Sequence, residues 1–381
     1  VSLDSASLTS SSGVIFSQNN ATDGGAVSAV NDSSVTDIGS NFSANAATLS
    51  GGALFASNST LSLTASFIED NSASSEGGGM ALSSGLVTAS GIVVGSNTAG
   101  RGGGMAINGT LVMAGSCEVK DNAATGSFGG ALWLGADGEL TSAGSSWTQN
   151  IAASGGAIFS AGGTVGITSD VFSLNVATEN GGALYASGGV LAADQCKIMS
   201  NTAVEEGGGL FATDECTVTD TASMFEANTA TNAFGGAMSV SNSMLSLTLT
   251  TIKSNTAAVH GGGVYATSSP ITASGVTVLW NSAVSGAGMI SNGTVTLSAC
   301  NFTANTASDQ GAGLWMGSGG TLASTGTVWS ENFAATDGGA VAVFDGNSTL
   351  SSDSFTQNEA TTRGGALYTS SGAMSMSDCT F

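Results

Sequence analysis

The densest group of carboxylates in this sequence is formed by Glu205, Glu206, Asp214 and Glu215. Neighbouring carboxylates can supply the acid and the base of glycoside hydrolysis or hold a Ca²⁺ ion. Both chemistries usually also place a cation beside the carboxylates, and no Lys or Arg lies close to this group in the sequence. We interpret the group as a solvated acidic patch, with a weak divalent-cation site as the alternative. We expect no catalytic residue, no cofactor and no metal requirement.

His260 is the only histidine of the chain and immediately precedes Gly261. The sequence contains no Ser-His-Asp or His-His spacing that would use it in nucleophilic catalysis or metal binding. The equivalent position elsewhere in the chain holds residues as different as Asp23, Phe128 and Arg363, so we expect it to be exposed. A polysaccharide lyase or hydrolase is kept as the alternative function from a different class.

Fourteen asparagines recur along the whole chain at an interval of about 26 residues. Each has a large apolar residue three positions before it and an alanine two positions after it, and a Gly-[Gly/Ala] pair follows. A fixed period of this length is the signature of a repeat protein whose coils contact only their neighbours. These ladder asparagines are Asn19, Asn45, Asn71, Asn97, Asn122, Asn150, Asn175, Asn201, Asn228, Asn255, Asn281, Asn305, Asn332 and Asn358.

One period contains three short segments in which apolar and small polar residues alternate, as in residues 42–67. This alternation predicts three short strands per coil, and strands so short can pair only with their counterparts one coil away. The predicted fold is all-β, a right-handed parallel β-helix of about 14 coils. We expect residues 1–381 to form a single β-helix that is a fragment of a longer chain, because Phe381 ends inside a repeat.

The repeated positions have structural explanations. Two apolar columns, one through Phe42 and Phe172 and one through Leu54 and Leu184, are expected to fill the core. Stacked ladder asparagines can bond to one another and to the backbone. The first glycine of each pair, such as Gly51, is expected to need a positive φ.

Composition limits the partners and the location of the chain. Five basic residues against 27 acidic ones give a net charge of −22, which excludes nucleic acid as a partner because phosphates bind clustered Lys and Arg. No segment approaches the ~20 apolar residues of a membrane helix, so we expect no membrane insertion by this segment. The given sequence opens without the basic and apolar regions of a signal peptide, and we expect any export signal to have been removed or left out.

All five cysteines are expected to be free. Four of them share one position of the repeat and lie three or more coils apart, which is ~14 Å at the strand spacing and beyond the ~7 Å limit for a disulfide. The fifth occupies a different position. The four that share a position are Cys117, Cys196, Cys300 and Cys379, and the fifth is Cys216.

The paired motifs Phe42-Ser-Ala-Asn45 with Gly51-Gly-Ala-Leu54, and Phe172-Ser-Leu-Asn175 with Gly181-Gly-Ala-Leu184, resemble the repeat of the chlamydial polymorphic membrane proteins. The resemblance extends through the chain, although Ile68, Val94 or Trp147 replaces the phenylalanine in some coils. It implies a secreted β-helical passenger, displayed at a cell surface, often adhesive and without catalysis.

Two further sets of residues are candidate contact or modification sites. Four consecutive coils place an aromatic residue at the outward position after the second core column, so stacking could form an exposed strip for a partner chain or glycan or stabilise the sheet. Eight asparagines outside the ladder lie in Asn-x-Ser/Thr sequences, which are either N-glycosylation sites or turns. The strip consists of Trp133, Phe159, Tyr185 and Phe211, and the sequons are Asn20, Asn31, Asn41, Asn58, Asn108, Asn292, Asn301 and Asn347.

The sequence therefore predicts a non-enzymatic extracellular or cell-surface protein, adhesin-like or structural. Its expected partners are a host or neighbouring cell surface, glycans, or copies of itself. The last of these would make it the shaft subunit of an extracellular filament, which is the alternative within the same class.

Overall fold

The structure, a computed structural model, describes all 381 residues and consists of strands and turns without a helix. It divides into two compact units. Unit 1 comprises Val1–Thr178 with Gly182–Ala192, and unit 2 comprises Glu179–Gly181 with Ala193–Phe381. Each unit carries seven of the ladder asparagines, and the chain makes about 14 turns of roughly 26 residues, as predicted.

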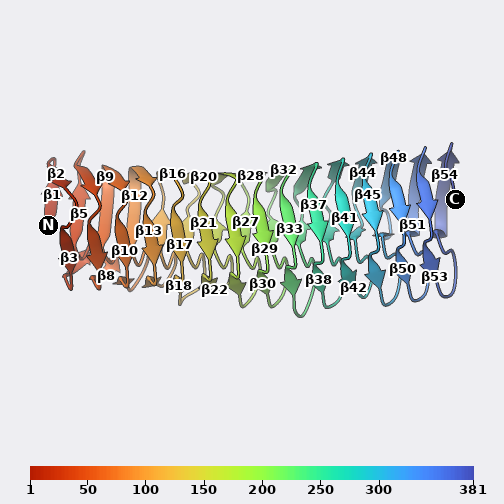
Figure 1. The fold of residues 1–381 in the computed structure, drawn as a ribbon, viewed down its shortest axis with the longest axis horizontal. Helices are drawn as coiled ribbons and strands as arrows, with labels where there is room; N and C mark the ends of the chain where they lie inside the picture. The colour runs from red at the N-terminus through yellow and green to blue at the C-terminus, as the bar shows by residue number, and fades with distance from the viewer. The chain divides into compact units, whose positions relative to one another are not determined.

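Each coil contributes one strand to each of three parallel sheets (Figure 1). Strands of successive coils pair in register, so that Phe42 lies beside Ile68 and Leu54 beside Met80. A coil of unit 1 is built from β7 (Asn41–Ser43), β8 (Ala46–Ser50) and β9 (Leu54–Thr64).

The strand in the largest sheet is usually divided in two by a bend. A coil of unit 2 therefore contains β37 (Thr251–Lys253), β38 (Thr256–Ala257), β39 (Val264–Thr267) and β40 (Ile271–Ser274). Four coils keep this strand continuous over 11 residues, in β9, β12 (Met80–Ser90), β51 (Val341–Ser351) and β54 (Leu367–Ser377). The three strands per coil predicted from the sequence are confirmed.

The two predicted apolar columns form the core. Phe42 and Phe172 in the first column and Leu54 and Leu184 in the second are at most 1% exposed. Burial of a large apolar side chain contributes ~1.5–3 kcal/mol, so these columns supply much of the stabilising free energy of each unit. The alanines after the ladder asparagines pack in a third, narrower column, for example Ala230, Ala257 and Ala283.

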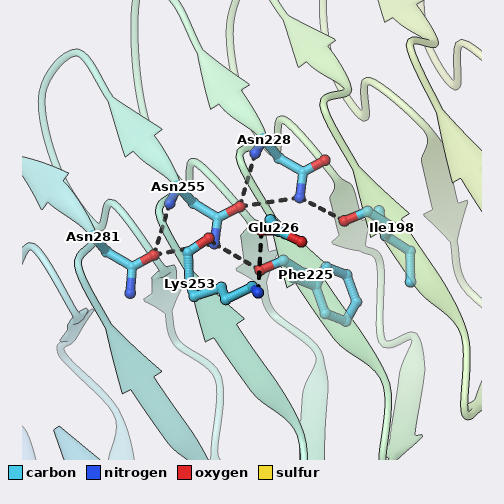
Figure 2. Close-up of polar contacts among 7 residues, drawn as sticks. All are labelled: Ile198, Phe225, Glu226, Asn228, Lys253, Asn255 and Asn281. Atoms are coloured by element: carbon cyan, nitrogen blue, oxygen red, sulfur yellow. Dashed lines mark hydrogen bonds and ion pairs between the residues drawn. The ribbon is translucent and has the colours of Figure 1, made fainter. Parts of the chain in front are cut away.

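The ladder asparagines connect neighbouring coils (Figure 2). The side-chain oxygen of Asn255 accepts hydrogen bonds from the backbone N–H and the side-chain amide of Asn228, at 2.9 and 3.0 Å. The Asn255 amide in turn donates to the carbonyl of Phe225 at 3.0 Å and to Oδ1 of Asn281 at 3.0 Å. Twelve of the fourteen ladder asparagines are buried, where only such satisfied amides are tolerated.

Glycine is required at the start of each Gly-[Gly/Ala] pair. Gly51 has φ 66° and a Cβ there would lie 2.2 Å from the carbonyl oxygen of Leu54. Gly261 has φ 65°, with 2.6 Å to the carbonyl oxygen of Val264. Both the left-handed backbone and the close approach exclude other residues, which confirms the expectation of a positive φ.

A longer repeat relates the two units. Trp133 and Trp147 of unit 1 recur 182 positions later as Trp315 and Trp329 of unit 2. Cys117 recurs 183 positions later as Cys300. The chain is therefore a tandem duplication of seven coils, and differences between equivalent positions show where the two copies have diverged.

We predict that Asn255→Ala destabilises the fold by at least ~2 kcal/mol, because two N–H donors of Asn228 and the carbonyl of Phe225 each lose a buried partner that costs ~1–3 kcal/mol to remove. The check is the free energy of unfolding from denaturant titration. Asn232 is exposed, so Asn232→Ala is the control and should change it by less than ~0.5 kcal/mol. Equal effects of the two substitutions would contradict the assigned role of the ladder.

Candidate functional site

The outward aromatic column lies on the largest sheet. In unit 1 it is carried by β19 (Leu132–Leu134), β23 (Ile158–Ser160) and β27 (Leu184–Ser187). Trp133, Phe159 and Tyr185 occupy matching positions of these strands, and the rings of Phe159 and Tyr185 stack with centroids 4.6 Å apart. Stacking is thus present between two of the four residues of the predicted strip.

The prediction that this column is an exposed strip is wrong for two of its members. Trp133 is 9% and Phe159 is 7% exposed. The guanidinium of Arg101 covers the ring of Trp133 at 4.0 Å, and the ring of Phe128 lies 4.3 Å from that of Phe159. Both covering residues come from the turn of the preceding coil, whereas Tyr185 is half-buried.

Phe211 belongs to unit 2, on β31 (Leu210–Thr213), and is half-buried. Its neighbour in the next coil is Ser239, so the aromatic run is interrupted there. The column then continues through Tyr265, Ile290 and Trp315. Aromatic residues thus occupy this outward face in both units.

The position before the first glycine is not uniformly exposed. Ser50 and Asp337 are buried at this position and His260 is half-buried, whereas Phe128 and Arg363 are exposed. The prediction of an exposed position is therefore wrong for His260, whose backbone is bridged to Phe234 and to Ser285 in the neighbouring coils. The imidazole also stacks on Phe234, with ring centroids 5.5 Å apart.

The acidic group lies mostly at the surface. Glu205, Asp214 and Glu215 are exposed, and Glu206 is half-buried. Burial raises the pKa of the Glu206 carboxyl, the hydrogen bond from the Ser239 hydroxyl at 2.7 Å opposes this rise, and the charge of Glu205 adds to it. No group of three or more His, Cys, Asp or Glu side chains is arranged to hold a metal ion.

Five buried aspartates were not recognised from the sequence, namely Asp37, Asp170, Asp220, Asp337 and Asp353. Two of them accept hydrogen bonds from core tryptophans. Asp170 accepts a hydrogen bond from the indole N–H of Trp147 at 3.1 Å and from the backbone N–H of Ser145 at 2.8 Å. Asp353 accepts from the indole of Trp329 at 3.5 Å. Burial raises the pKa of Asp170, and its hydrogen bonds partly oppose this. The sequence does contain a signal for Asp170 and Asp353. After each of the two core tryptophans, Trp147 and Trp329, an aspartate lies five positions before the next ladder asparagine.

The candidate glycosylation sites differ in exposure. Asn20, Asn31, Asn58, Asn292 and Asn347 are exposed. The remaining three, Asn41, Asn108 and Asn301, are half-buried. None is as deeply buried as the interior ladder asparagines.

All five cysteines are free, as predicted. Four are buried rather than semi-buried, because their position faces the core, and Cys379 is half-buried. Burial raises the pKa of the Cys216 thiol to about 11. Burial likewise raises the pKa of Cys300.

Two segments of the chain match a known protein repeat. The Chlamydia polymorphic membrane protein repeat matches at residues 171–187 and 354–370. These two copies of the repeat lie 183 positions apart, which is the period of the duplication.

No curated protein matches the chain. No helix in the structure is long and apolar enough to cross a membrane. The polymorphic membrane protein repeat and the parallel β-solenoid together fit a surface protein of the adhesin type.

We predict that the native protein exposes one reactive thiol. The thiolate is the nucleophile in disulfide exchange, and the raised pKa of Cys216 keeps that buried group protonated at pH 8. Titration with Ellman's reagent at pH 8 should modify Cys379 first, and the other four thiols only in denaturant. Cys379→Ser should abolish the fast phase. A fast phase that survives this substitution would show that the core cysteines are accessible.

Proposed function

We propose that this chain is a non-enzymatic, extracellular surface protein that adheres to a cell surface through an outward face of its β-solenoid. The observation that carries the proposal is the polymorphic membrane protein repeat, found twice in a chain built entirely of parallel coils. No group of three or more His, Cys, Asp or Glu side chains is arranged to hold the Ca²⁺ ion that a Ca²⁺-dependent elimination requires.

The contact residues that we assign to this function belong to the outward aromatic positions of each unit. Of the four predicted contact residues, Tyr185 of unit 1 and Phe211 of unit 2 are half-buried, so each can meet a partner without unfolding its unit. Trp133 and Phe159 lie beneath Arg101 and Phe128, so they stabilise the sheet and contribute less to direct contact with a partner. Aromatic side chains of limited flexibility bind flat partners or sugars with a small loss of conformational entropy.

We predict that the double substitution Tyr185→Ser and Phe211→Ser lowers binding to target cells about tenfold, the equivalent of ~1.4 kcal/mol, while the thermal midpoint changes little. Flow cytometry with the labelled protein measures the binding. Trp280 is 60% exposed and follows β41 (Thr277–Leu279) in a different sheet, so Trp280→Ser is the matched control.

Three results, from this experiment and from assays of filament assembly and of enzyme activity, would contradict the proposal. Unchanged cell binding by the double variant would remove the aromatic face from the function. Concentration-dependent filaments in place of cell binding would favour the shaft subunit. Turnover of pectin or alginate by the purified chain would favour the polysaccharide enzyme.

The exposed sequons are proposed as N-glycosylation sites when the chain passes through a eukaryotic secretory pathway. Asn347 is exposed, whereas the side-chain oxygen of Asn41 is buried. We predict by mass spectrometry, before and after enzymatic removal of glycans, that Asn347 is modified in the secreted protein and Asn41 is not. Modification of Asn41 at equal occupancy would show that folding does not govern the choice of site.

A further inference from the structure

A hollow of about 220 Å³ opens on the outward face of the largest sheet in unit 2. This volume is smaller than the ~300–1,000 Å³ of sites for drug-sized ligands, so it suits a single ring. Six of the residues that line it are His260, Tyr265, Thr267, Ile290, Asn292 and Trp315.

The walls of the hollow are two aromatic side chains held two coils apart. Tyr265 on β39, Ile290 on β43 (Met289–Ser291) and Trp315 on β47 (Leu314–Met316) occupy matching positions. The backbones of β39 and β47 are therefore separated by ~9.6 Å. Ile290 between them is 5% exposed and forms the floor. Because its side chain is shorter than an aromatic one, a gap is left between the two rings.

Each wall is supported from outside the hollow. The ring of Phe234 stacks on that of Tyr265, with centroids 4.5 Å apart and an interplanar angle of 14°. Phe344 stacks on Trp315 at 5.6 Å and 28°, and the Trp315 indole N–H donates to Oε1 of Gln310 at 3.3 Å. The two aromatic rings are thus fixed before any ligand arrives, which reduces the entropy cost of binding.

Polar groups line the edge of the hollow. Oδ1 of Asn292 accepts a hydrogen bond from the backbone N–H of Ser268 at 2.8 Å, which orients the amide and leaves its NH₂ group as a donor. The hydroxyl of Thr267 donates to Oγ of Ser241 at 3.3 Å, so its oxygen can accept a hydrogen bond from a ligand. This combination of apolar faces and polar edge matches the two kinds of surface on a sugar ring.

The charges around the hollow select against an anionic ligand. Burial lowers the pKa of His260, so its imidazole is neutral near pH 7. Burial and the nearby Glu206 carboxylate raise the pKa of Tyr265. No Lys or Arg lines the hollow. A carboxylated sugar would therefore meet a nearby negative charge with no cation to compensate.

The duplicated unit 1 contains the same tryptophan without the hollow. Trp133 is the equivalent of Trp315, but Arg101 covers it at 4.0 Å, and Ala81 stands two coils before it at the position of Tyr265. In unit 2 the place of Arg101 is taken by the small residue Ser285. Trp133 is consequently buried and Trp315 is half-buried.

We propose that the hollow between Tyr265 and Trp315 binds one neutral pyranose ring. The C–H faces of the ring pack on the aromatic walls, and its hydroxyls bond to Asn292 and Thr267. A neutral sugar would be the ligand class of the proposed surface function. Its binding is argued from the hollow itself, and only its biological setting rests on that function.

The test uses the full chain made in a host without N-glycosylation, because Asn292 lies in a sequon. Methyl glycosides of neutral hexoses and N-acetylhexosamines are titrated while saturation-transfer NMR and tryptophan fluorescence are recorded, with methyl glucuronide as the anionic comparison. We expect saturable binding of at least one neutral glycoside and weaker binding of the glucuronide. Trp315→Ala and Ser285→Arg should each weaken binding at least tenfold, whereas Trp280→Ala should not.

Ser285→Arg keeps both walls and should close the hollow as Arg101 does in unit 1, so it separates loss of the site from loss of the fold. Absence of saturable binding by the unaltered chain, or equal binding by the Ser285→Arg variant, would overturn the assignment. Cell binding is measured in parallel. Sugar binding without cell binding would reject the surface function alone, and cell binding without sugar binding would reject the hollow alone.

Discussion

The parallel pairing of each coil with the next is the constraint on which the rest of this structure depends. It places every residue directly beside its counterpart one period away, so each column of side chains must stack on itself. The ladder asparagine meets this requirement with one side chain, because its oxygen accepts two N–H groups from one neighbouring coil while its amide donates to the other. The small alanine follows from the same close approach of coils, whereas the glycine with positive φ is required by the turn within its own coil, where a Cβ at Gly51 would meet the carbonyl oxygen of Leu54.

The outward positions also stack from coil to coil, as Phe159 and Tyr185 do, but they do not fill the core, so their residue types vary more between coils. Whether an aromatic residue on the outward face is accessible depends on the side chain that the neighbouring turn places over it. Arg101 covers Trp133, whereas Ser285 leaves Trp315 open to the hollow. A duplicated solenoid can in this way acquire a site by a few substitutions in turns, without changing the core that both copies need.

The sequence predicted the fold because one period contains all the contacts of a coil, and fourteen copies of the same pattern leave one consistent register. It also predicted the free cysteines and the structural role of the asparagines and glycines. It did not predict the burial of Trp133 and Phe159 or the half-buried state of His260. Those depend on residues in another coil, such as Arg101, Phe128 and Phe234, which have no fixed identity in the repeat. The buried pairs of Trp147 with Asp170 and Trp329 with Asp353 become visible only when two consecutive coils are read together.

Amide hydrogen exchange of the ladder asparagines tests the central claim most directly. If the side-chain oxygen of each asparagine holds the backbone N–H of its neighbour, the backbone amides of interior members such as Asn97 and Asn228 should exchange as slowly as those of the core strands. The backbone amide of the exposed turn residue Asp137 should exchange far faster. Exchange of the interior ladder amides at the rate of exposed turns would contradict the account, since the coils would then be joined by their strands alone.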